Sequence, residues 1–264
     1  MLQAVISIPE MASAVWLTAV ADMKRVRDVC LPANALLDPE TPALCARLGL
    51  EIAVARELAT RDIAPYLDEM PAPACEGLVT AILDALQRCR EHGVRAAFLG
   101  CGLERISGER SEIALATRVD FLRKLMPRDD NSTLRLCLPV RYPQPSPGDR
   151  EREWAGRIVH EVMHPDCRLA LTVFPSELPT DFAVREAIRP VAFQLGLVQF
   201  SYEPMLGETI RPEVLRQWLT ALRWHGYKGL VVFRPVLTDE SWVEPVCERL
   251  DRLIEAVDDG SAAT

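Results

Sequence analysis

The segment 212–233, PEVLRQWLTALRWHGYKGLVVF, contains a helix, a turn and a strand in direct succession. Its first part, 212–224, has apolar residues at helical spacing and stops just before Gly226. Its last part, Leu230-Val231-Val232-Phe233, is apolar at every position. A strand that is apolar on both faces is typical of a parallel sheet covered on both sides. The segment therefore predicts one helix–strand unit of an α/β fold.

The same unit recurs along the chain. A helix is predicted over 75–91, with apolar residues on one face, and it stops at His92-Gly93 before the next strand. A further helix is predicted over 247–257, close to the end of the chain. The predicted strands are 3–8, 26–31, 50–55, 94–99, 134–138, 169–174, 197–201 and 230–233.

Eight strand–helix alternations without a linker predict a single-domain α/β fold, the (β/α)8 TIM barrel, over residues 1–257. Residues 258–264 are expected to form a flexible C-terminal tail. The proline-rich stretch 139–147 is interpreted as a loop. A doubly wound open sheet is the alternative, but Ile8-Pro9-Glu10-Met11 follows the first strand in place of a G-x-G-x-x-G turn.

Composition excludes several classes of protein. Of the 264 residues, 49% are hydrophobic and 26% charged, which is typical of a globular chain. The net charge of −8 argues against nucleic-acid or membrane binding. No run reaches the ~18 apolar residues of a membrane span, and the apolar stretch 11–21 lacks the positive charges of a signal peptide.

The eight cysteines are scattered and form no C-x-x-C pair. Most lie inside apolar stretches, so we expect small buried thiols and a cytoplasmic location. Cys101, between two glycines, is the candidate for a nucleophilic cysteine.

Two stretches resemble the xylose-isomerase-like TIM barrels, the superfamily of sugar-phosphate isomerases and epimerases. Residues 81–100 are similar to that family's helix, glycine and fourth strand, and residues 215–233 to its final helix, G-Y-x-G turn and eighth strand. His164-Pro165-Asp166-Cys167 looks like its approach to strand six. The resemblance implies a divalent metal held by Glu, Asp, His and Glu at the ends of strands five to eight.

This chain departs from that pattern at the corresponding positions. Strand five ends in 140–142 (VRY), strand six in 174–176 (FPS) and strand seven in 200–203 (FSYE), while Arg234 stands where the last glutamate is expected. An arginine cannot ligate a cation and repels one at short range. We therefore expect no metal and no cofactor.

In a barrel, charged residues at the strand C-termini would surround the catalytic mouth. Arg141 and Arg234 could clamp a carboxylate or phosphate. Glu203 is the candidate catalytic base and Tyr202 a candidate donor. Further substrate-binding candidates are Arg56, Glu104 and Glu177. The alternative is that these arginines form ion pairs with the glutamates and fill the space that a metal would take.

The sequence His160-Glu161-Val162-Met163-His164 also matches H-E-x-x-H, the zinc-peptidase motif. Helical spacing puts both histidines on the solvent side, opposite a face that includes Trp154, Ile158 and Met163. No third histidine follows, and Glu177 and Glu186 are the alternative third ligands. In a barrel this segment also lies on the face opposite the catalytic mouth.

These observations lead to a first hypothesis: a divergent sugar isomerase/epimerase-like barrel without a metal. It would bind a sugar, sugar phosphate or sugar acid at the strand C-termini. The alternatives are a non-catalytic barrel that acts as a scaffold or binding partner, and a zinc hydrolase that uses His160, Glu161 and His164. Whether the chain is an enzyme stays open at this stage, and oligomerisation is possible.

Overall fold

The computed structural model describes residues 3–8, 13–59, 67, 72–100, 103, 111–126, 133–142, 150–174, 181–204, 210–237 and 239–261. Its eight strands pair in parallel, in the order β1 to β8, and β8 pairs with β1 to close the barrel. The predicted TIM barrel is confirmed, and the open-sheet alternative is wrong. The strands are β1 (Gln3–Ser7), β2 (Asp28–Pro32), β3 (Glu51–Arg56), β4 (Ala96–Phe98), β5 (Arg135–Tyr142), β6 (Cys167–Val173), β7 (Leu195–Tyr202) and β8 (Leu230–Pro235).

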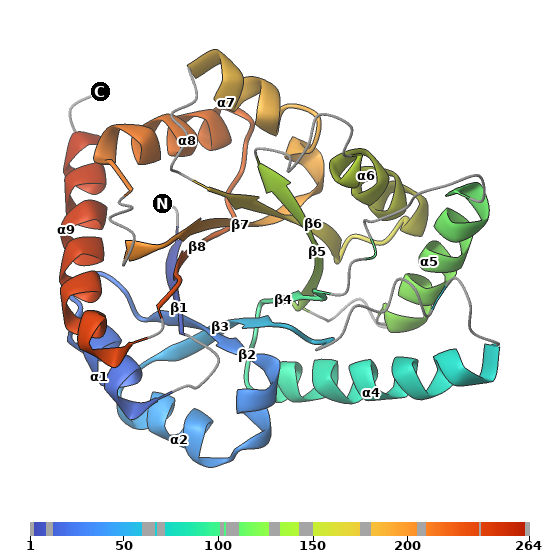
Figure 1. Cartoon of the computed structure of the whole chain (residues 1–264), viewed down its shortest axis with the longest axis horizontal. Helices are drawn as coiled ribbons and strands as arrows, with labels where there is room; N and C mark the ends of the chain where they lie inside the picture. The colour runs from blue at the N-terminus through green and yellow to red at the C-terminus, as the bar shows by residue number, and fades with distance from the viewer. Residues whose placement is uncertain are drawn as a thin grey trace.

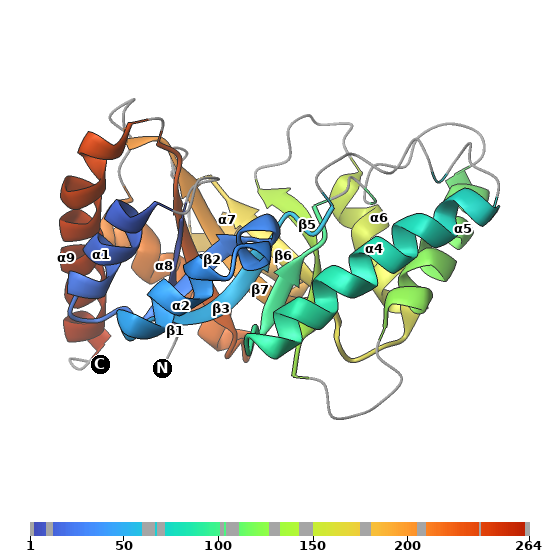
Figure 2. The ribbon, with the colours of Figure 1, turned by 90° about the horizontal axis from the view of Figure 1, so that it is seen from below.

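Helices surround the strands as an outer ring (Figure 1), and they run alongside the barrel when it is seen from the side (Figure 2). They are α1 (Ala14–Asp22), α2 (Glu40–Arg47), α4 (Ala72–Glu91), α5 (Ser111–Leu125), α6 (Glu151–Val162), α7 (Asp181–Ile188), α8 (Pro212–Trp224) and α9 (Val243–Ser261), with short 3-10 turns η1 (Ala33–Leu37), η2 (Ala192–Gln194) and η4 (Glu240–Trp242). None of the helices in the described ranges is long and apolar enough to cross a membrane.

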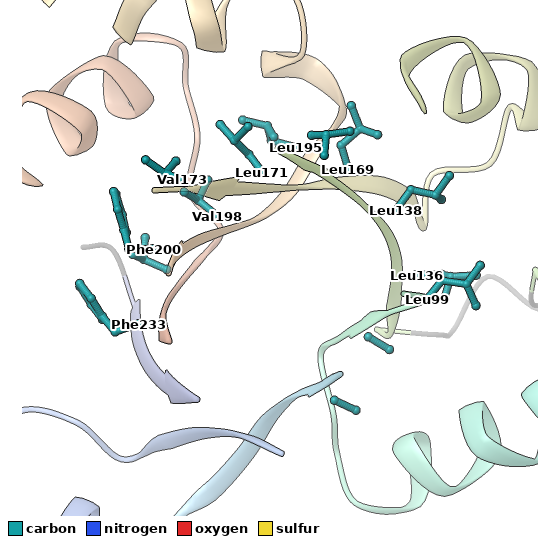
Figure 3. Close-up of a cluster of buried hydrophobic side chains, with 14 of the residues drawn as sticks. Leu99, Leu136, Leu138, Leu169, Leu171, Val173, Leu195, Val198, Phe200 and Phe233 are labelled. Carbon is teal, nitrogen blue, oxygen red and sulfur yellow. The ribbon is translucent and has the colours of Figure 1, made fainter. Parts of the chain in front are cut away.

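The core has two layers, because alternate side chains of a strand point to opposite faces. The larger layer lies between the strands and the helices, and Figure 3 shows part of it on the outer side of the strands. There Phe200 stacks on Phe233, with ring centroids 5.9 Å apart, and meets Trp218 of α8 edge to face at 6.2 Å. The smaller layer fills the barrel and consists of Val5, Cys30, Ala53, Val54, Ala96, Phe98, Cys137, Ala170, Leu197, Leu230 and Val232.

Two predicted boundaries differ from the structure. β5 continues through Pro139 to Tyr142, although 139–147 was interpreted as a loop. The missing N–H of Pro139 removes one donor, yet Val140, Arg141 and Tyr142 stay in register with β6. Helix α9 continues to Ser261, so the first part of the predicted tail is helical. Sequence patterns place helix ends poorly, because the final turn has no fixed apolar signal.

The N-terminal end of the barrel is closed by a polar network. Gln3 donates to Oδ2 of Asp28 at 2.6 Å, and Arg95 binds both Gln3 and Asp28. Burial raises the pKa of Asp28, while Arg95 opposes that shift. Residues on this face of a TIM barrel normally serve stability, whereas catalytic and binding residues lie on the opposite face.

Candidate functional site: the C-terminal mouth of the barrel

Polar side chains line the inside of the barrel near its C-terminal end. On β7 the apolar Val198, Phe200 and Tyr202 belong to the outer layer, so Gln199 and Ser201 face inward. The same alternation directs further polar side chains inward, because each lies an even number of residues from a member of the inner layer on its own strand. They are Ser7, Arg56, Thr172 and Arg234, at a distance of two residues, and Arg141, at a distance of four. The interior therefore changes from apolar to polar towards the mouth.

Strand register places these polar residues side by side. Thr172 of β6 pairs with Arg141 of β5 and with Gln199 of β7. The Gln199 amide donates to the Thr172 hydroxyl at 3.5 Å. Ser201 pairs in turn with Arg234 of β8. Hydroxyl, amide and guanidinium groups thus form a continuous belt from β5 to β8.

Two of the candidate arginines meet one carboxylate. Arg56 is 4% exposed, and its guanidinium binds Oε1 of Glu57 and donates to the carbonyl oxygen of Ile8 at 3.0 Å. Nη2 of Arg234 lies 3.9 Å from the same Oε1 of Glu57. The structure thereby brings together β3 and β8, which are separated in the barrel by β1 and β2. Within the part of the chain that the structure describes, the buried Nε of Arg56 has no hydrogen-bond partner.

The backbone at Glu57 is unusual. Its φ of 60° lies in the left-handed region, which non-glycine residues rarely adopt. The amides of the next two residues, Leu58 and Ala59, donate to the carbonyl oxygens of Phe98 and Leu99, each at 3.2 Å. Because the chain is held by β3 on one side and by these bonds on the other, Glu57 keeps this conformation.

Cys30 lies on the floor of this cluster. Burial raises the pKa of its thiol to about 11, against the opposing effects of Arg56, a Ser7 hydrogen bond and Arg234. The thiol is therefore neutral at neutral pH, and a neutral buried thiol is a poor nucleophile. The six cysteines whose side chains the structure describes, Cys30, Cys45, Cys89, Cys137, Cys167 and Cys247, are buried and free, which confirms that part of the expectation. Cys101, the candidate nucleophile, lies outside the described residues.

Arg141 has a different partner from Arg234. Its Nη2 donates to Oε1 of Glu151, the buried first residue of α6, at 3.0 Å. The structure thus ties Arg141 to α6 and Arg234 to Glu57, so the two arginines pair with different carboxylates. Ion pairs with glutamates, the alternative considered for these arginines, do form, but with Glu57 and Glu151.

Tyr202 lies away from the barrel interior. It belongs to the outer layer, and it lines a cavity of about 360 Å³ with residues of α9 such as Val246 and Arg249. Burial raises the pKa of Tyr202, which keeps its hydroxyl protonated. The expectation that Tyr202 accompanies Glu203 overlooked the alternation along β7. Glu203 itself is exposed and directly follows β7, whereas Glu104 and Glu177 lie outside the described residues.

The H-E-x-x-H segment lacks the geometry of a zinc motif. Helix α6 ends at Val162, and Met163 adopts a left-handed conformation with φ of 56°. His160 is therefore on the helix, while His164 lies beyond it and accepts a hydrogen bond from the amide of Asp166 at 3.2 Å. The left-handed residue also turns Met163 outward to 84% exposure, contrary to its predicted place on the buried face.

The described residues at the ends of β5 and β8 also fail to fit the divalent metal that the resemblance implies. Arg141 and Arg234 occupy inward positions at the ends of β5 and β8, and guanidinium groups offer no lone pair to a cation. Across the described ranges, no three His, Cys, Asp or Glu side chains gather closely enough to hold a metal ion.

Sequence reasoning missed several residues of this mouth. Ser7, Cys30, Thr172, Gln199 and Ser201 were passed over because each sits within an apolar strand. The signal that could have found them is the alternation of side chains along a strand, since all five fall on inward-facing positions. Glu57 gave no such signal, because its placement depends on a left-handed backbone.

Comparison with known proteins shows what the fold resembles. No family profile matches the chain, and no curated protein matches it in sequence. Among solved structures, a 3-keto-D-glucoside 4-epimerase from E. coli superposes with a TM-score of 0.66 at 16% identity, covering 96% of this chain and 99% of that chain. This chain therefore shares the (β/α)8 barrel fold of that epimerase.

Two further structures support this assignment. A D-psicose 3-epimerase from Clostridium cellulolyticum H10, solved with D-tagatose, gives a TM-score of 0.63 at 14% identity, with 99% of each chain covered. A family 2 AP endonuclease from Brucella melitensis gives 0.64 at 15% identity, covering 93% of this chain and 99% of that chain. Sugar epimerases and an AP endonuclease thus share the architecture, and the fold alone does not choose between chemistries.

Proposed function

We propose that this barrel binds a small polyhydroxylated anion, a sugar acid or sugar phosphate, at its C-terminal mouth. The observation that carries the proposal is the convergence of Arg56 and Arg234 on one point, with the buried Nε of Arg56 left without a partner. Buried polar atoms are normally paired, so a buried donor without a partner among the described residues suits an oxygen of a ligand. Guanidinium groups are well matched to carboxylate and phosphate.

The neutral belt supports the polyhydroxylated part of the proposal. Thr172, Gln199 and Ser201 are buried, and their hydroxyl and amide groups both donate and accept hydrogen bonds. A sugar offers hydroxyl groups of the same dual character. Arg141, at the β5 end of the belt, is the additional cation that could contact such a ligand.

We further propose that Glu203 acts as a base in an isomerase or epimerase reaction. It is exposed directly after β7, on the face where TIM barrels carry their chemistry. A single well-placed general base contributes about 10²–10⁴-fold. The sugar epimerases among the structural neighbours share this fold, which makes proton transfer on a sugar the first reaction to test.

The binding test is a thermal-shift screen of sugar acids, sugar phosphates and neutral sugars. We expect a shift with anionic sugars that disappears in Arg234→Ala. Arg189→Ala is the matched control, since this exposed arginine follows α7 at the opposite end of the barrel and pairs with Glu186 at 3.2 Å. A shift that survives Arg234→Ala contradicts the proposed site.

The catalytic test follows exchange of carbon-bound protons of a binding sugar in D2O by NMR. Glu203→Gln is expected to slow the exchange, and Glu186→Gln to leave it unchanged.

A scaffold role is the second candidate, favoured by the ion pairs that already engage Arg56, Arg141 and Arg234. Absence of any ligand shift, together with a stable complex with another protein, would support the scaffold. Buried free thiols suit the reducing cytoplasm, where we place the protein.

A further inference from the structure

The carboxylate of Glu57 occupies the point at which the proposed function places the anionic group of a ligand. One of its oxygens contacts Arg56 of β3 and lies 3.9 Å from Arg234 of β8. These strands are not neighbours, so main-chain pairing does not bring the two guanidinium groups together. Glu57 is their shared partner across the mouth.

The backbone keeps this carboxylate at the mouth at an energetic cost. A left-handed conformation costs a non-glycine residue roughly 1–2 kcal/mol, and glycine would adopt the same φ without that cost. The chain nevertheless carries glutamate at this position. The neighbouring left-handed position after β4 is a glycine, Gly100, which packs against Glu57: a Cβ there would lie 3.6 Å from the Glu57 Cα. A strained residue held by its surroundings is characteristic of functional sites.

The burial of the three groups is uneven. The Arg56 side chain is 5% exposed, whereas those of Glu57 and Arg234 are 37% and 38% exposed. Arg56 is fixed further by its bond to the carbonyl oxygen of Ile8. The buried Arg56 side chain is therefore fixed in position. The Glu57 carboxylate lies on the solvent-facing side of the site, and rotation of this side chain can free its place beside the two arginines.

We propose that Glu57 is an internal occupant of the anion subsite, which a carboxylate or phosphate of the ligand displaces. The inference rests on the proposed function and names the ligand class more narrowly. A neutral hydroxyl forms weaker bonds to guanidinium than a carboxylate does, so a neutral sugar does not displace Glu57. An anion does, because it offers an equivalent charge and further oxygens to the open Nε of Arg56. Glu57 is thus a specificity-determining residue that selects against uncharged sugars.

Titration calorimetry with inorganic phosphate tests this proposal. Glu57→Gln removes the competing charge and is expected to bind phosphate about fivefold more tightly than the unmodified protein, the scale of one partly exposed ion pair. Glu186→Gln removes the same charge from an arginine pair on α7 and is expected to behave as the unmodified protein. The double variant Glu57→Gln/Arg234→Ala is expected to lose this increase in phosphate affinity.

A second variant protects the test against misfolding. Glu57→Gly also removes the carboxylate, and it adopts the left-handed backbone without strain, so it is expected to fold and to bind phosphate more tightly. Equal or weaker binding by folded Glu57→Gln and Glu57→Gly overturns the proposal and assigns Glu57 to orienting the arginines. Absence of phosphate binding in all variants also overturns it. The proposed function is decided separately, by the Arg234-dependent shift with anionic sugars.

Discussion

Replacing Met163 tests whether α6 ends before His164. Met163 is 84% exposed and adopts φ of 56°, immediately after the last helical residue, Val162. Glycine is the usual residue at such a helix terminus, because it reaches the left-handed region without a Cβ penalty. We therefore expect Met163→Gly to stabilise the protein.

The magnitude follows from two opposing effects. Glycine removes roughly 1–2 kcal/mol of left-handed strain, but it loses roughly 0.5–1 kcal/mol more backbone entropy on folding than alanine. Met163→Ala also removes the exposed side chain and keeps the strain, so it is the matched control. Met163→Gly is expected to exceed Met163→Ala by about 1 kcal/mol in the free energy of unfolding.

Urea unfolding monitored by circular dichroism measures that difference. An H-E-x-x-H zinc site requires a helix that continues through His164. In such a helix Met163→Gly would be less stable than Met163→Ala, because glycine inside a helix is about 1 kcal/mol less favourable than alanine. If Met163→Ala is the more stable of the two variants, the assigned helix end is wrong. The argument against the zinc motif then fails with it.

Three other predictions concern the core and titrating groups. Phe200→Ala removes a fully buried ring stacked on Phe233 and is expected to cost about 3–5 kcal/mol in urea unfolding; a loss below 1 kcal/mol contradicts the packing. The raised pKa of Asp28 gives stability that is full below its ordinary value of 3.8 and is lost as pH rises through the folded-state pKa. Asp28→Asn should remove this decline from the pH–stability curve, and an unchanged curve refutes the assignment. Cys30, with its pKa raised to about 11, should resist iodoacetamide at pH 8 in the native protein and react after unfolding, as peptide mass spectrometry can show; native labelling contradicts its burial.

The fold was predictable because its signals are local and repeated. Apolar runs such as 230–233, several of which follow a helix that ends near glycine, indicate buried parallel strands whatever their partners are. The ends of these elements were less predictable. β5 passes through Pro139 because pairing with β6 outweighs one missing donor, and no property of Pro139 itself reveals that partner.

The candidate site was predictable in part. Arg56 and Arg234 could be chosen from sequence because charged residues at strand C-termini mark the mouth of a barrel. Their shared contact with Glu57 could not, because it joins strands 178 positions apart in numbering, from 56 to 234, through a left-handed backbone. Tyr202 follows the same rule by position along the strand, but the alternation along β7 directs its side chain to the outer layer.

The order of apolar and polar residues is enough to specify eight strands, their covering helices and a barrel, since each pattern reflects burial along a short segment. Which arginine meets which glutamate depends on strand tilt, register and single backbone torsions, and these arise only when distant segments close the ring. Arg141 therefore pairs with Glu151 of α6, while Arg56 and Arg234 meet at Glu57. The sequence determines which charged groups are present, but how they pair is a property of the closed barrel.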